Sequence, residues 1–151
     1  CEIIFSIEGE IQNYNFFEAR IRSHKRMTYA QVDKFLTTGS GLDRNISSSL
    51  KSLQILTKIL LKIRNKRGAL EIEGQEPLLD IDAEGRVKKI VLPKRLFSHQ
   101  MVEEAMLAAN VCAANFMNKN YNFGVYRIHE EPDELKLESL KKFFKQLCYK
   151  A

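Results

Sequence analysis

One segment constrains the fold more than any other: residues 98–118 predict a helix that is apolar almost all round. Its apolar side chains are distributed over every face, with no single stripe: Met101, Val102, Ala105, Met106, Leu107, Ala108, Ala109, Val111, Cys112, Ala113 and Ala114. A helix without a polar face is stable only when other elements surround it. We therefore expect this helix in the middle of a larger packed structure.

The rest of the chain predicts an α+β fold, in which short antiparallel β-sheets are packed with four or five α-helices. Alternating apolar residues over positions 1–7, a turn at 8–10 and a long return strand over 11–21 predict an N-terminal hairpin. Helices are predicted from Thr28 to the glycines at 39–41, over 46–66, and from Pro132-Asp133 to about residue 148. Further short strands are predicted at 69–73, 78–82, 87–92 and 124–129.

The length of 151 residues fits a single domain piece covering residues 1–151. The chain opens on strand-like residues without an initiator Met, so we expect a fragment taken from the interior of a longer protein. No apolar run approaches the roughly 18 residues that a membrane span needs, and no membrane partner is expected.

Charge and cysteine content narrow the class of protein only slightly. The net charge of +5 permits a polyanionic partner but does not demand one. The three cysteines, Cys1, Cys112 and Cys148, are odd in number and far apart, which fits neither a disulfide framework nor a zinc site. They favour a reducing, cytoplasmic setting.

The common catalytic templates are missing. The sequence has no glycine-rich phosphate loop, no nucleophile elbow and no His-Glu-x-x-His pair, and its three histidines lack metal-ligand spacing. Asp80 and Asp82 precede a glycine-containing hairpin turn, and a solvated turn explains them better than a cation site. We expect no catalytic residue and no metal ligand in this chain.

A basic segment precedes the first predicted helix. Arg20, Arg22 and His24 occupy alternate positions, Lys25 and Arg26 follow, and Tyr29 comes just beyond. Cations on one strand face beside an aromatic ring can hold RNA phosphates while the ring stacks on a base. The alternative interpretation is a solvated strand edge with Tyr29 buried at the start of a helix.

Two acidic residues, Glu103 and Glu104, lie near the start of the apolar helix. An ionised carboxylate in such surroundings is costly unless it meets a cation, a hydrogen-bond donor or a ligand. One of the two could equally lie on a solvated face. A third polar segment, residues 126–130, is better explained as a strand leading to a helix cap.

Four segments together resemble the ribonuclease II and ribonuclease R family, with the closer likeness to its bacterial ribonuclease R branch. Residues 22–32, RSHKRMTYAQV, are similar to the family's RSHARLTYxxV stretch. Residues 67–71, RGALE, resemble RGALxF, and residues 103–110, EEAMLAAN, resemble IEExMLxAN. Residues 125–133, VYRIHEEPD, resemble LYRxHExP. The four occur in the family's order and cover nearly the whole chain.

The resemblance implies part of an RNB catalytic domain, in a processive 3′-to-5′ hydrolytic exoribonuclease that releases nucleoside 5′-monophosphates. In such enzymes Mg²⁺ ions held by aspartates activate water, and single-stranded RNA enters a basic channel as far as its 3′ end. Carried over to this chain, Tyr29 stacks near the 3′ end and Glu103 and Glu104 reach the terminal nucleotides. Arg20, Arg22 and Lys25 guide the phosphates. Family members act largely as monomers.

This sequence departs from the family pattern at two places. Ile72 stands where the family has an aromatic residue that clamps a base, and an aliphatic side chain offers no π-face. Nothing matches the family's metal-binding aspartate block, its assisting arginine or its accessory RNA-binding domains. The isolated chain is therefore expected to be inactive and to bind no Mg²⁺ of its own. Its apolar faces could also make it oligomerise.

A different class of function fits the same residues: a catalytically silent module that binds RNA or another protein. Salt-dependent RNA binding would not separate this alternative from the enzyme.

Overall fold

The structure is a computed structural model that describes residues 1–70 and 77–147. It confirms the α+β class, with four helices and two small antiparallel sheets in the described residues. The chain divides into two compact units, Cys1–Phe116 and Met117–Ala151, and the division falls inside the third helix. Each unit is described by itself.

The first unit begins with the predicted hairpin. Strand β1 (Glu2–Phe5) pairs with β2 (Ile11–Asn15), and the register places Glu2 opposite Asn15. The predicted return strand over 11–21 is wrong beyond Asn15. Because β1 begins at Glu2, no strand of the described chain lies beside the residues that follow Asn15. The basic segment therefore has no regular secondary structure.

The first helix, α1 (Tyr29–Thr38), begins and ends where local sequence predicts. The Thr28 hydroxyl accepts a hydrogen bond from the backbone N–H of Gln31, whose side chain accepts one from the N–H of Thr28. This reciprocal capping satisfies two backbone donors at the helix start. Gly39 ends the helix in the left-handed region, at φ 71°.

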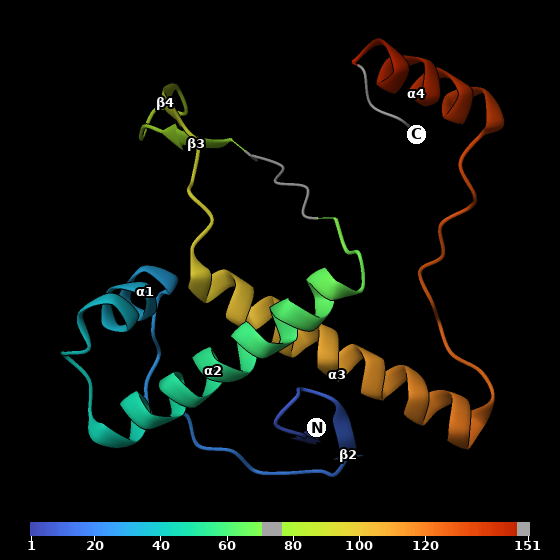
Figure 1. The fold of residues 1–151 in the computed structure, drawn as a ribbon. Coiled ribbons are helices and arrows are strands. Elements are labelled where there is room, and N and C mark those ends of the chain that lie inside the picture. Colours follow the sequence, from blue (N-terminus) through green and yellow to red (C-terminus); the bar gives the residue numbers. More distant parts are fainter. Residues whose placement is uncertain (71–76, 148–151) are drawn as a thin grey trace. The chain divides into compact units, whose positions relative to one another are not determined.

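The long helices α2 (Arg44–Lys66) and α3 (Phe97–Tyr121) cross each other, with the β1–β2 hairpin beside them (Figure 1). The buried side chains of the unit gather on α1, α2 and α3: Phe35, Thr57, Ser98, Met101, Glu104 and Cys112. Ser98 joins α3 to α1, because its backbone N–H donates to Asp33 (2.9 Å) and its hydroxyl donates to the carbonyl of Tyr29 (2.9 Å). The start of α3 is thereby fixed against the start of α1.

The hairpin turn packs tightly against α2. Gly9 is buried at φ 89°, and a Cβ there would lie 2.6 Å from Ile59 and 2.7 Å from Ile63. Only glycine combines this backbone conformation with such a close approach.

A second hairpin pairs β3 (Leu78–Ile81) with β4 (Val87–Val91), as the sequence predicts. Both strands are exposed. Asp82 accepts backbone hydrogen bonds from Glu84 and Arg86 in the connecting turn, which confirms its interpretation as a turn residue. The predicted strand at 69–73 is absent from Ala69 and Leu70, and its other residues lie outside the described part.

The second unit contains the end of α3 and helix α4 (Glu134–Gln146). Asp133 caps α4 by accepting from the N–H of Leu135, as predicted. The strand predicted at 124–129 is wrong: no strand among the described residues pairs with this segment, and Val125 is fully exposed. The large apolar side chains of α4 are exposed as well.

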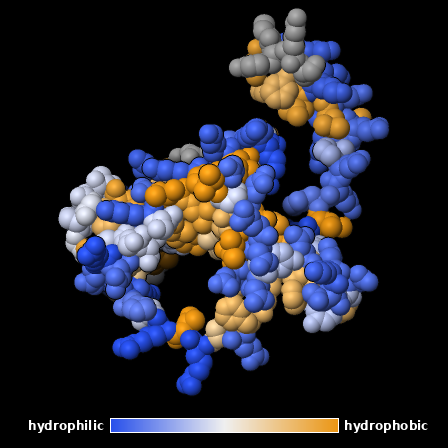
Figure 2. Space-filling view, turned by 60° about the horizontal axis from the view of Figure 1, so that its bottom comes forward, coloured by the Kyte–Doolittle hydropathy of each residue, from blue (hydrophilic) through white to orange (hydrophobic). Residues whose placement is uncertain are grey.

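Many large apolar side chains reach the surface. Figure 2 shows them in patches among the charged residues. On α3, Met106, Leu107 and Val111 are exposed although the helix is apolar all round. None of the described helices is long and apolar enough to cross a membrane.

Candidate functional site

Tyr29 occupies the first turn of α1, where the Thr28 cap fixes the backbone. Its ring stacks on the imidazole of His99, with the ring centroids 4.0 Å apart and the planes at 25°. The residue keeps 44% of its surface exposed. The interpretation of Tyr29 as a buried helix-start residue is therefore wrong.

His99 lies in the first turn of α3 and is held by the backbone before it. Its Nδ1 accepts a hydrogen bond from the N–H of Leu96 at 3.1 Å. An accepting Nδ1 leaves Nε2 as the protonated nitrogen of the neutral ring. The imidazole thus has a fixed orientation, which also sets the orientation of the stacked Tyr29 ring.

Glu103 and Glu104 share one guanidinium from α2. Nη1 of Arg64 lies 2.8 Å from Oε1 of Glu103 and 2.8 Å from Oε1 of Glu104. The other Glu103 oxygen accepts from Arg95 in the segment before α3. The side chain of Glu104 is 7% exposed, whereas that of Glu103 is 35% exposed. Of the partners that the sequence left open for these carboxylates, the structure shows cations: Arg64 for both and Arg95 for Glu103.

Electrostatics favour the charged state of this cluster. The hydrogen bond from Arg64 holds the pKa of the Glu103 carboxyl below its ordinary value; burial acts in the opposite direction, and Arg95 adds to the lowering. The same two carboxylates raise the pKa of Arg64. Glu103 is therefore ionised at any physiological pH.

The structure brings the predicted ring and the predicted carboxylates to the same end of α3. The Tyr29 ring stacks on His99, and His99 precedes Glu103 by four residues. The side chains of His99 and Glu103 therefore lie on one face of α3. Tyr29 is more than 70 residues away in sequence from Glu103 and Glu104. The fold brings the Tyr29 ring to the helix that carries both carboxylates, and the grouping of these residues as one RNA site stays a prediction.

The basic residues are placed differently. Arg20, Arg22 and Lys25 are exposed, and the strand that was to align the first two does not form. Within the described part of the chain, neither Arg20 nor Arg22 makes a side-chain hydrogen bond or ion pair. Lys25 borders a pocket of about 440 Å³ between the basic segment, α1 and α2. The predicted residue Ile72 lies outside the described residues.

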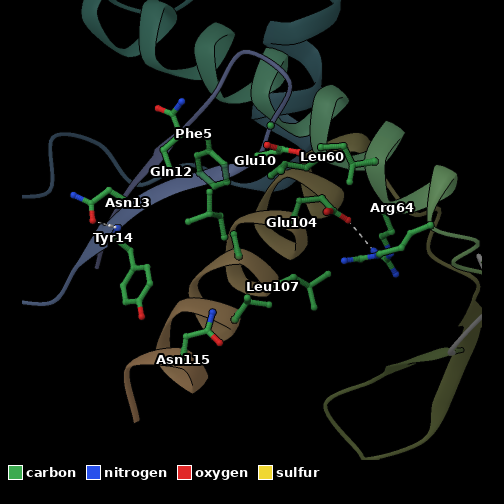
Figure 3. A pocket seen from close by; sticks show the side chains of 16 residues that line it. Phe5, Glu10, Gln12, Asn13, Tyr14, Leu60, Arg64, Glu104, Leu107 and Asn115 are labelled. Atoms are coloured by element: carbon green, nitrogen blue, oxygen red, sulfur yellow. Dashed lines mark hydrogen bonds and ion pairs between the residues drawn. The ribbon is translucent and has the colours of Figure 1, made fainter. Parts of the chain in front are cut away.

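A larger cavity of about 600 Å³ opens beside Glu104, between the β1–β2 hairpin, α2 and α3 (Figure 3). Arg64 and Glu104 lie at one end, joined by their ion pair, and Tyr14 and Asn115 lie toward the other. Its floor consists of apolar side chains from both helices, among them Leu60, Ile63, Leu107, Ala108 and Val111. The Arg64–Glu104 pair thus faces an open space.

Sequence reasoning missed Arg64, Arg95 and His99. Nothing in the local sequence distinguishes Arg64 from the other basic residues of its helix, and His99 is one of three histidines without metal-ligand spacing. The cost of burying a carboxylate in an apolar helix was the signal that a cation, a hydrogen-bond donor or a ligand had to lie nearby, unless the carboxylate lay on a solvated face. It could not say which of many lysines and arginines supplies the charge.

The model of the RNB domain family matches residues 1–150. This chain belongs to the RNB domain family. The RNB chain is 33% identical over 150 residues to ribonuclease R of Vibrio parahaemolyticus serotype O3:K6, a match that covers 97% of the chain and 18% of that protein. It is 30% identical over 149 residues to exoribonuclease 2 of Buchnera aphidicola subsp. Acyrthosiphon pisum, covering 96% of the chain and 23% of that protein.

Solved structures show the same fold. Ribonuclease R of Mycoplasma genitalium, in complex with ribose-methylated single-stranded RNA, superposes with a TM-score of 0.88 at 29% identity, covering 98% of this RNB chain and 23% of the other. The complex of that enzyme with double-stranded RNA gives 0.87 at 30% identity, with coverage of 96% and 26%. The chain thus spans about a fifth to a quarter of the length of these relatives.

Proposed function

We propose that this RNB chain acts as the central part of the catalytic domain of a processive 3′-to-5′ hydrolytic exoribonuclease, which releases nucleoside 5′-monophosphates. In that enzyme it supplies the clamp for the 3′-terminal nucleotides and part of the channel wall. Family membership and the ribonuclease names of the relatives support the enzyme class. The observation that carries the clamp is the stack of Tyr29 on His99, one helical turn from the Glu103–Glu104 pair.

The stack of Tyr29 on His99 orients the Tyr29 ring before a nucleobase binds. His99 fixes one side of the Tyr29 ring, and the exposed remainder is free to stack on a nucleobase. A ring that is already oriented loses little conformational freedom when a ligand binds, so more of the stacking energy appears as affinity. The neighbouring carboxylates accept hydrogen bonds and therefore suit the hydroxyl donors of a ribose.

Phosphates are contacted by the basic segment. Arg20, Arg22 and Lys25 are exposed cations just before Tyr29 in sequence, and the net charge of +5 has the sign that attracts a polyanion. Because the segment lacks regular structure, these side chains act as separate charged contacts along a strand of RNA rather than as an aligned row.

The described residues do not fit the Mg²⁺ ions that the resemblance implies. Within residues 1–70 and 77–147, no group of three or more His, Cys, Asp or Glu side chains comes together. Glu103 and Glu104 are already bound to arginines. Other parts of a longer enzyme therefore hold the metal ions and carry out the hydrolytic step. The isolated chain binds RNA without hydrolysing it. The enzyme is proposed to act in the cytoplasm, as a monomer.

Binding of linear and circular RNA tests the clamp. Linear oligo(A) and a circular oligo(A) of equal length present the same bases and phosphates, but only the linear form has a 3′ end. Without added metal, we expect tighter binding of the linear form, by about 1–3 kcal/mol for one stacked base. Equal affinity would show an RNA-binding module that does not recognise ends, and no binding would leave the protein-interaction alternative.

A further inference from the structure

Arg64 joins the two elements that frame the candidate site. It lies in the last turn of α2, and its Nη1 donates to Glu103 and to Glu104 over equal distances of 2.8 Å. Adjacent residues of an α-helix project about 100° apart, so their carboxylates diverge unless something draws them together. A single nitrogen with two N–H groups, presented from the neighbouring helix, supplies that constraint.

We propose that Arg64 is a positioning residue for RNA binding: it draws the Glu103 and Glu104 carboxylates together and keeps them aimed at the 3′-terminal nucleotide. This inference rests on the proposed function, since it gives the carboxylates a ligand. It goes beyond that function, because Arg64, which does not itself touch the RNA, sets the geometry and the charge state of the Glu103 and Glu104 carboxylates from another helix.

Charge compensation gives a second reason for the arginine. Two uncompensated carboxylates beside an RNA strand would repel its phosphates. Arg64 and Arg95 together balance the charges of Glu103 and Glu104 and leave the cluster neutral. The pair can then accept hydrogen bonds from sugar hydroxyls without a net negative field. Removing Arg64 restores the repulsion as well as the divergence.

The charged and titratable groups around Glu103 come from several elements. Arg64 faces it from α2, Arg95 from the segment before α3, and His99 precedes it by one turn on its own helix. Asp33 and Tyr29 of α1 lie against the start of α3, where they bind Ser98. Arg67 borders the cavity beside Glu104. Of these groups, Arg64 makes the largest contribution to the lowered pKa of Glu103.

A purely structural role, as a link between α2 and α3, would show the same contacts. The two roles differ in what changes when the charge is removed. Loss of a purely structural link lowers thermal stability and raises the pKa of Glu103, because the ion pair is lost, but it leaves the preference for an RNA end unchanged. Loss of a positioning residue also lowers the preference for an RNA end.

The test compares Arg64→Met with Arg64→Lys. Methionine removes the charge and the donors but keeps an unbranched apolar stem, while lysine keeps the charge and three N–H donors. Arg86→Met is the matched control, because Arg86 forms ion pairs with Asp82 and Glu84 in the exposed β3–β4 turn, away from Glu103. Arg64→Gln, which keeps two N–H donors without the charge, replaces Arg64→Met if that variant does not fold.

Two readouts are measured on each variant. NMR of the side-chain carboxyl carbons, without RNA, follows the titration of Glu103; the affinity ratio of linear to circular oligo(A) follows end recognition. We expect Arg64→Met to raise the pKa of Glu103 and to lower the linear-to-circular ratio about tenfold at pH 7. Arg64→Lys should keep most of the lowering of the Glu103 pKa and most of the linear-to-circular ratio. Arg86→Met should change neither the pKa nor the ratio.

An unchanged Glu103 titration in Arg64→Met overturns the inference. So does a shifted titration with an unchanged linear-to-circular ratio, provided that Tyr29→Ala lowers this ratio; the proposed function then stands without Arg64. If the unmodified chain shows no preference for linear RNA, the proposed function fails, and the positioning role fails with it.

Discussion

Tyr29 and His99 stack with their ring centroids 4.0 Å apart, and this contact joins the start of α1 to the first turn of α3. The hydroxyl of Ser98 reinforces the junction by donating to the carbonyl of Tyr29. The Tyr29 ring, which follows the basic segment in sequence, is thereby held beside the helix that carries the acidic pair.

Replacing Tyr29 with Ala should weaken binding of linear oligo(A) by about 1–3 kcal/mol, because one aromatic platform is lost. Tyr29→Phe keeps the ring and should retain most of the affinity. Fluorescence anisotropy with 5′-labelled RNA measures both. Equal losses in the two variants would mean that the hydroxyl, and not the stacking surface, holds the RNA.

Glu103 should make the free energy of unfolding depend on pH. Its pKa is lowered in the folded state, so the stability it contributes is complete above the ordinary glutamate pKa of about 4.3 and is lost as pH falls through the lower folded value. Glu103→Gln should therefore destabilise the chain at pH 7, and the difference from the unmodified chain should shrink below about pH 4.3. Urea unfolding at several pH values measures this.

The control for that experiment is Glu18→Gln, at an exposed glutamate whose side chain forms no ion pair within the described part of the chain. It should leave the pH dependence as it was. A stability difference for Glu103→Gln that stays constant from pH 7 to pH 3 would contradict the ion pair with Arg64.

Gly9→Ala should be more destabilising than Gly85→Ala. Both glycines have positive φ, 89° and 82°, so each substitution carries about 1–2 kcal/mol of backbone cost. Only at Gly9 does the added Cβ meet side chains, those of Ile59 and Ile63, which adds about 1–3 kcal/mol of overpacking. Urea unfolding gives both values, and equal losses would show that the hairpin turn does not pack on α2.

Cys112 should resist alkylation in the folded chain. It is fully buried, and burial raises the pKa of its thiol, so both access and the reactive thiolate are reduced. Cys1 is exposed and should react first with iodoacetamide at pH 8, as followed by mass spectrometry of the separate peptides. Labelling of Cys112 should begin only with urea unfolding; equal rates without urea would contradict the packing of α3.

Local chemistry made much of this fold predictable. The Thr28 cap, Gly39, and the periodic leucines of α2 fix helix positions through nearby residues alone, and the structure confirms them. Strands at 16–21 and 124–129 failed because a strand needs a partner, which a local pattern cannot supply.

The residues of the candidate site could be selected from the sequence, but their geometry could not be predicted. The acidic pair and Tyr29 stood out, because a carboxylate in an apolar helix and a ring beside cations are each unusual. Arg64 did not, since its importance depends on how α2 crosses α3. Such a crossing is set by packing over the whole interface, which the sequence of either helix leaves open.

Fluorescence of 2-aminopurine at the 3′-terminal position of a bound oligo(A) tests the 3′-end clamp most directly, because stacking quenches this base. We predict strong quenching on binding to the unmodified chain, loss of that quenching in Tyr29→Ala, and little change when the 2-aminopurine is at the 5′ end. Quenching that is equal at both ends, or that persists in Tyr29→Ala, would contradict the placement of the RNA 3′ end against Tyr29.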